Sequence, residues 1–138
     1  MEALTIYYSA SKYKVLIQPN VYQTFESLEN IFKYFPNEHI QFDKNSFLNA
    51  FQETEFEEEF TTDNTIYVLH QDKLGIKNEQ NKLIIPPIFD QIIYYPTENL
   101  YLIQEGEFCF VLDSELKTTY APTLEVILHL EGENVELR

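Results

Sequence analysis

Short apolar runs alternate with polar turns along the sequence, and at the beginning of the chain they predict a β-hairpin. Residues 4–9 and 13–17 are rich in β-branched and aromatic side chains, which favour extended strands. The intervening Ala10-Ser11-Lys12 is short enough to connect two antiparallel strands, and Pro19-Asn20 ends the second one. We therefore expect the chain to open with a two-stranded hairpin.

Two segments with helical periodicity follow the hairpin. In the first, Thr24 is the expected N-cap and Pro36 the expected end, because proline cannot continue a helix. The second is expected to begin near Asn45-Ser46, and beyond residue 53 its apolar positions lose their common face. The pattern leaves open whether this helix continues past Thr54. The apolar positions are Phe25, Leu28, Ile31, Phe32 and Phe35 in the first helix, and Phe47, Leu48 and Phe51 in the second.

From residue 65 onward the pattern changes to short apolar runs separated by turn residues, which is typical of an antiparallel β-meander. The expected strands are 66–70, 74–77, 83–85, 92–95, 100–104, 108–112 and 125–130. These elements predict an α+β fold, in which an N-terminal hairpin and two helices precede the meander. We divide the chain into an N-terminal α/β half, 1–62, and a β-rich half, 63–138, with one continuous domain as the alternative.

The β-rich half contains an internal repeat, and such a repeat bears on the whole fold. Residues 67–76 align with 101–110 without a gap, which places Gln71-Asp72 and Glu105-Gly106 at the apices of two hairpins. After one inserted residue the register resumes at an offset of 35. The matched pairs there are Lys82 with Lys117, Pro87 with Pro122, Phe89 with Leu124 and Asp90 with Glu125. Two copies of one unit are therefore expected over residues 65–130.

Individual residues of the first copy have structural interpretations. Asn81 is expected at a turn position with positive φ, which Asn tolerates better than most residues. Pro86-Pro87 cannot donate ladder hydrogen bonds, so we expect the strand to end there. The motif therefore predicts a turn, a strand and the end of that strand, and it gives these residues structural roles rather than catalytic ones.

At these residues the chain resembles the WG-repeat family, a group of bacterial β-rich repeats. The resemblance rests on Leu74-Gly75, Asn81-Lys82, Ile85-Pro86-Pro87 and Phe89-Asp90 in the first copy, and on Phe108-Cys109, Lys117, Pro122 and Leu124-Glu125 in the second. The chain departs from the family in having no Trp, in carrying Cys109 at the position of the signature Gly, and in lacking the turn Gly. Because the functions of such repeats are mostly unassigned, the resemblance implies a fold for about half the chain rather than an activity.

Composition changes the functional picture, because 23 Asp and Glu stand against 9 Lys and Arg, a formal net charge of −14. Such a chain repels nucleic-acid phosphates and anionic membranes, so we expect neither as a partner, and it favours a basic protein. The alternative is that the acidity serves solubility alone. The single Cys109, the absence of a signal peptide and the absence of a long apolar span predict a cytoplasmic protein. The residues predict no oligomeric state.

No residue pattern points to catalysis, a metal or a cofactor. His39, His70 and His129 are far apart in sequence, and none has the spacing of a metal site. Cys109 lies in an apolar run, which favours a buried, inert thiol. The three glycines are isolated, so no Gly-rich loop is available to bind phosphate. We therefore predict no catalytic residue, no metal ligand and no cofactor.

The densest negative charge follows the second predicted helix, and it is the candidate binding site. Its carboxylates are Glu53, Glu55, Glu57, Glu58, Glu59 and Asp63, with Tyr94 and Tyr95 as candidate aromatic anchors. The leading hypothesis is a non-enzymatic protein-binding module, most concretely an acidic bacterial immunity protein that neutralises a basic, nuclease-like toxin. The alternatives are a structural or scaffolding module of the WG-repeat type, and a small hydrolase whose site is assembled from scattered residues.

Overall fold

The computed structural model describes residues 4–36, 38–52, 54–118, 122, 126–130 and 133–137, and this part of the chain is mostly β-structure. Strands account for 54% and helices for 12%, and the two helices found in the described residues have 7 residues each. The α+β prediction is therefore wrong.

The elements of the first part are β1 (Leu4–Ser9), β2 (Lys12–Gln18), β3 (Val21–Phe25), α1 (Leu28–Tyr34), β4 (Ile40–Phe42) and α2 (Lys44–Ala50). The later elements are β5 (Glu58–Thr62), β6 (Thr65–His70), β7 (Lys73–Lys77), β8 (Leu83–Phe89), β9 (Gln91–Tyr95), β10 (Leu100–Glu105), β11 (Phe108–Leu112), β12 (Val126–Leu130) and β13 (Glu133–Leu137).

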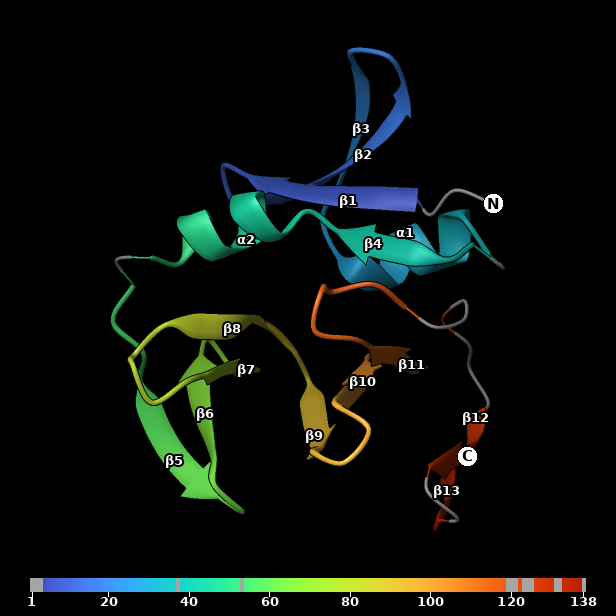
Figure 1. Ribbon diagram of the computed structural model, residues 1–138. Helices are drawn as coiled ribbons and strands as arrows, with labels where there is room; N and C mark the ends of the chain where they lie inside the picture. The colour runs from blue at the N-terminus through green and yellow to red at the C-terminus, as the bar shows by residue number, and fades with distance from the viewer. Residues whose placement is uncertain are drawn as a thin grey trace.

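The N-terminal sheet has the strand order β3-β2-β1-β4 and forms the upper part of Figure 1. β1 and β2 form the predicted hairpin, and Ala10 and Ser11 both have positive φ, as a tight two-residue turn requires. β4 lies parallel to β1 on the opposite side, so the connection through β2, β3 and α1 must cross over the sheet. The sheet therefore has more strands than the predicted hairpin.

The first helix begins later than predicted. Thr24 and Phe25 pair with β2, so they complete β3 instead of opening a helix. Ser27 is the N-cap, and its hydroxyl accepts a hydrogen bond from the backbone N–H of Asn30 at 3.2 Å. Phe25 is buried in β3, and a helix would have buried it as well. The spacing of apolar residues therefore could not distinguish a strand from a helix at this position.

The second helix ends at Ala50, and the acidic segment beyond Thr54 forms β5. Asp43 is the N-cap, with its carboxylate accepting a hydrogen bond from the Ser46 N–H at 3.0 Å. The loss of a common apolar face thus marked the end of the helix. Because β5 pairs with β6, a segment assigned to the N-terminal half adds a strand to the β-sheets, and this is one reason that the fold class was wrong.

Two sheets lie side by side below the N-terminal sheet in Figure 1, one with the order β5-β6-β7-β8 and one with the order β11-β10-β9. β12 and β13 form a separate two-stranded hairpin. One cluster of buried side chains joins the upper and lower parts, with Phe42 contacting Phe89 at 5.7 Å between ring centroids and Phe89 contacting Phe110 at 5.9 Å. Backbone bonds reinforce this junction, since Phe42 N–H donates to the Leu116 carbonyl and Thr118 N–H to that of Ile40, each at 2.9 Å.

The lower sheets repeat one local structure at the 35-residue offset. The Asn78 side chain accepts backbone hydrogen bonds from Gln80 and Lys82, and the Asp113 side chain accepts the equivalent bonds from Glu115 and Lys117. The residues at positive φ also correspond, with Asn81 at 64° as predicted and Leu116 at 62°. The second hairpin turn comprises Gly106 and Glu107, so its predicted apex at Glu105-Gly106 was wrong by one residue. The matched Leu124 and Glu125 lie outside the described residues.

β8 does not end at Pro86-Pro87 but runs through both prolines to Phe89, so that prediction was wrong. The ladder is irregular there instead, because the register with β7 shifts between Leu74 and Ile76. The proline backbone crosses closely over Gly75, where an added Cβ would lie 2.5 Å from the Ile85 carbonyl oxygen and 2.7 Å from the Pro87 nitrogen. Gly75 is therefore required by close backbone contact rather than by an unusual φ.

Gly75→Ala is expected to lower the free energy of unfolding by about 1–3 kcal/mol or more, because the new methyl group meets backbone atoms that cannot rotate away. Urea denaturation followed by circular dichroism measures this change. Thr61→Ala on the exposed strand β5 is the control, with an expected change within about 0.5 kcal/mol. Equal stability of the two variants would contradict the close crossing of β7 and β8.

Candidate functional site

β5 is an edge strand with an unpaired outer side. It is the first strand in the order β5-β6-β7-β8, it bonds only to β6, and it lies at the margin of the molecule in Figure 1. All five of its residues, Glu58–Thr62, are exposed. Such an edge presents backbone donors and acceptors to solvent, together with the side chains of both strand faces.

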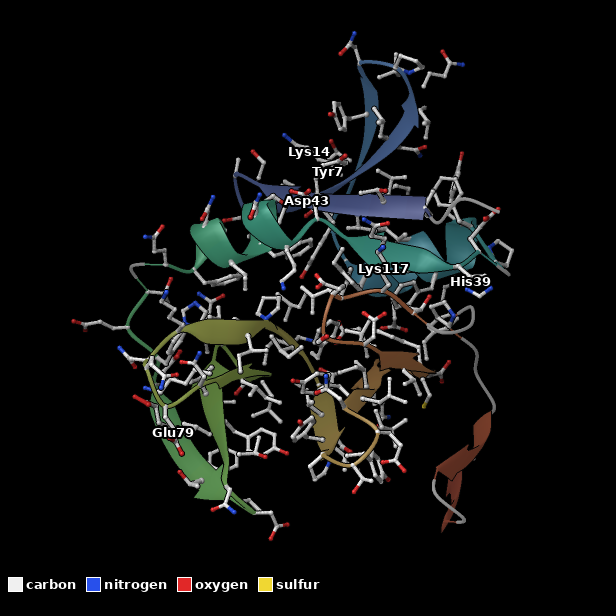
Figure 2. The ribbon with its side chains drawn as sticks, in the orientation of Figure 1. Tyr7, Lys14, His39, Asp43, Glu79 and Lys117 are labelled. Atoms are coloured by element: carbon white, nitrogen blue, oxygen red, sulfur yellow. The ribbon has the colours of Figure 1, made fainter. Side chains whose placement is uncertain are left out.

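Five exposed carboxylates lie along this strand and its neighbours, and we call them the acidic edge. They are Glu55, Glu58, Glu59, Asp63 and Glu79. Glu79 comes from the loop between β7 and β8, and Figure 2 labels it next to β5. It lines a shallow depression of about 330 Å³ together with Glu59 and Phe60. Sequence reasoning missed Glu79 because only the β5–β6–β7 pairing brings its loop beside β5.

Glu57 has an internal role, although it lies between these carboxylates in the sequence. Its Oε1 accepts a hydrogen bond from the Gln71 N–H at 3.0 Å, and its Oε2 lies 3.1 Å from Nδ1 of His70. The backbone bond from Gln71 and the contact with His70 lower the pKa of Glu57. Glu57 therefore caps the turn between β6 and β7.

Asp90 performs the same task at the next hairpin. Its Oδ2 accepts a hydrogen bond from the Gly106 N–H at 2.7 Å in the turn between β10 and β11. Burial acts to raise the pKa of Asp90, but the bonds from Lys73 and Gly106 outweigh it and the pKa is lowered. The carboxylates at Glu57 and Asp90 are thus equivalent parts of two consecutive units.

The members of the acidic edge differ in how far they are neutralised. Glu59 forms an ion pair with Lys77, whose side chain is only 13% exposed against 47% for Glu59. Glu55 and Glu58 have no ion-pair partner among the described residues. Glu53, the remaining predicted carboxylate, lies outside the described residues. Asp63 and Glu79 have no ion-pair partner among the described residues either, so Glu59 is the neutralised member of the acidic edge and the other four carry the charge available to a partner.

The two predicted tyrosines lie on β9, in the neighbouring sheet. Tyr94 is half-buried, stacks on Tyr101 with 4.8 Å between ring centroids, and donates its hydroxyl proton to Asn99 Oδ1 at 3.1 Å. Tyr95 is half-buried as well. The exposed aromatic residue at the acidic edge is Phe60, which is 42% exposed and stacks on Tyr67 with 5.2 Å between centroids. The sequence contained the signal for Phe60, an aromatic residue within the acidic segment.

A second cluster of charged groups joins the two lower sheets. Lys73 Nζ lies 2.6 Å from Asp90 Oδ1 and 3.1 Å from both Glu105 carboxylate oxygens. Glu105 Oε1 also accepts the Asp90 N–H at 3.1 Å, and burial raises the pKa of Glu105 to about 6. A depression of about 610 Å³ lies nearby and is lined by Lys73, Tyr13 and His70 among others, but not by Glu105. The Glu105 carboxylate is thus committed to internal partners.

Comparison with known proteins adds no further assignment: no family model, no curated protein and no solved structure matches this chain. Within the described residues, no three His, Cys, Asp or Glu side chains are grouped so that they could hold a metal ion. Neither described helix has the length and apolar character needed to cross a membrane. Burial raises the pKa of the Cys109 thiol, which disfavours the reactive thiolate.

The Glu105 cluster generates a prediction about pH. Because the pKa of Glu105 is raised from 4.5 to about 6 in the folded chain, the folded state binds this proton more tightly than the unfolded state does. This contribution to stability is complete below the unfolded pKa and is lost as the pH rises through the folded pKa. The wild type is therefore expected to lose stability relative to Glu105→Gln between pH 4.5 and about 6.

Urea denaturation of both proteins across this pH range measures the difference. Glu57 and Asp90 have pKa values lowered from 4.5 and 3.8, so they titrate below this pH range, although Asp90 shares Lys73 with Glu105. Glu107→Gln, at an exposed position in the adjacent turn, is the control and is expected to track the wild type at every pH. A stability difference between wild type and Glu105→Gln that does not change with pH would contradict the raised pKa.

Proposed function

We propose that this chain is a non-enzymatic protein-binding module whose acidic edge docks onto a basic protein. The observation that carries the proposal is the gathering of five exposed carboxylates along one unpaired sheet edge. In its most concrete form, the module is an immunity protein that neutralises a basic, nuclease-like toxin in the cytoplasm. A nuclease must present Lys and Arg to bind phosphates, and carboxylates in extended array complement such a surface.

The carboxylates of the acidic edge and the exposed ring of Phe60 contribute to different steps of binding, namely association with the partner and contact within the complex. The net charge of −14 steers a basic partner towards the chain and raises the rate of association at low salt. Glu55 and Glu58 supply charge that is not already neutralised within the molecule. Phe60 lies on β5 between Glu59 and the turn residue Asp63, where its ring offers apolar contact at the centre of the charged surface. Tyr94 and Tyr95 stay predicted anchors from the neighbouring sheet.

A structural or scaffolding module is the second candidate function. The recurrence of the Asn78 loop at Asp113 supports it, because equivalent units side by side are the architecture of repeat scaffolds. Such a module binds through the surface of β6–β11 and without dependence on salt. The response of binding to ionic strength therefore separates the two functions.

Reversing two charges of the acidic edge is expected to weaken binding of a basic partner by at least about tenfold, which corresponds to about 1.4 kcal/mol. The variant is Glu55→Lys with Glu58→Lys, because both side chains are exposed and neither has an ion-pair partner within the described residues. Wild type and variant are used to capture proteins from a host lysate at low salt. The affinity of the captured partner is then measured by calorimetry.

The matched control is Glu107→Lys with Glu115→Lys, which makes the same change of net charge on exposed residues away from β5. It also breaks an exposed ion pair of Glu115 with Lys44 at 3.6 Å, and pairs of this kind contribute little to stability. Under the proposal this control retains most of the affinity, and binding of the wild type weakens as salt is raised. Equal loss of affinity in both double variants would assign the effect to net charge alone. Capture that is insensitive to salt and to both double variants would overturn the proposal in favour of a scaffold.

A further inference from the structure

The hairpin of β2 and β3 projects away from the rest of the molecule at the top of Figure 1. It carries an exposed apolar surface, with Ile17 46%, Val21 43% and Tyr22 49% exposed. These are three of the six large hydrophobic residues that are exposed in the described part of the chain. Single exposed apolar residues are common, but several on one projecting element mark an interaction surface.

β3 is also an open sheet edge. It stands first in the order β3-β2-β1-β4, and it pairs with β2 alone. Its sequence, Val21–Phe25, contains no charged residue, no proline and no glycine. Natural edge strands are usually protected from pairing with other chains by charges, prolines or bulges. The irregularity in this hairpin lies between Leu16 and Gln18 of β2, which leaves the outer side of β3 without such protection.

The charge around this edge is nearly balanced, unlike that of the molecule as a whole. From Leu4 to Phe25 the chain has no Asp or Glu, and its charged residues there are Lys12 and Lys14. Figure 2 places Lys14 with Tyr7 and Asp43 near the base of the hairpin. The first carboxylate beyond it, Glu26, is paired with Lys12 at 2.6 Å. A basic partner therefore has no electrostatic reason to bind here.

A second copy of this chain fits the edge. Two copies with a net charge of −14 each repel one another over most of their surfaces, and the acid-free β2–β3 hairpins are where that repulsion is least. Two uncharged β3 strands can pair without electrostatic repulsion. Pairing of two β5 strands would instead bring the carboxylates of Glu58 and Glu59 from both copies close together. We propose that the chain forms a symmetric dimer in which the β3 strands of two copies pair antiparallel and continue the N-terminal sheet.

A two-fold axis through Gln23 gives the expected register. Tyr22 of one copy then lies opposite Thr24 of the other, and the exposed Val21 lies opposite the edge of Phe25. Pairing of this kind satisfies the outward backbone groups of β3 and covers the apolar tip of the hairpin. It leaves the acidic edge at β5 free, so it is independent of the proposed function.

Light scattering after size exclusion, on the full chain from about 10 µM to about 500 µM, tests the dimer. The wild type is expected to approach twice the monomer mass as concentration rises. Tyr22→Lys is expected to remain monomeric, because it places a charge on the pairing strand of each copy. Ile93→Lys is the matched control, since it also places a lysine at an exposed apolar position, 47% exposed on β9 of another sheet, and it is expected to dimerise like the wild type.

Thr24→Lys, at an exposed position of the same strand, is a second variant that keeps the test valid if Tyr22→Lys fails to fold. It too is expected to be monomeric. Higher salt is expected to strengthen the dimer, since it screens the repulsion between copies; a complex made through the acidic edge weakens instead. A wild type that stays monomeric throughout overturns the proposal. It is also overturned if both β3 variants dimerise normally, or if Ile93→Lys loses the dimer as they do.

Discussion

Phe89 lies where the three main sheets meet, and the packing of its ring holds the molecule together. It is fully buried at the end of β8, with Phe42 of the N-terminal sheet on one side and Phe110 of the β9–β11 sheet on the other. Each of the three sheets has an apolar side that it must bury against a neighbour, and this junction lets one cluster serve all of them. The sheets that carry the acidic edge and the β2–β3 hairpin thus both contribute to one cluster of buried side chains.

Among the strands that end a sheet, β5 and β3 have contrasting character. β5 is acidic along its length and exposes Phe60 among its carboxylates, whereas β3 is uncharged and apolar at its tip. Charge on an edge strand prevents pairing with an identical copy but attracts strands and surfaces of opposite sign. Under our two proposals, this contrast directs the two edges to different kinds of partner, a basic protein at β5 and a second copy of the chain at β3.

The many carboxylates of this chain also divide by task. Glu57 and Asp90 have the same role in two consecutive units, since each accepts one backbone hydrogen bond from a hairpin turn, Glu57 from Gln71 and Asp90 from Gly106. Glu105 is buried and connects the lower sheets through its contacts with Lys73 and Asp90. Carboxylates such as Glu55 and Glu58 remain exposed to solvent. A run of acidic residues that looks uniform in the sequence is therefore part scaffold and part surface.

The sequence by itself determined the local features that depend on neighbouring residues. The first hairpin and the positive φ of Asn81 follow from turn chemistry that acts within a few residues. Pairing between distant segments decided the rest. Bonding to β2 drew Thr24 and Phe25 into a strand despite their helical spacing, and close passage over Gly75 let β8 continue through its prolines. Glu79 joined the acidic edge in the same way, because hydrogen bonds between strands place side chains at positions that sequence spacing does not encode.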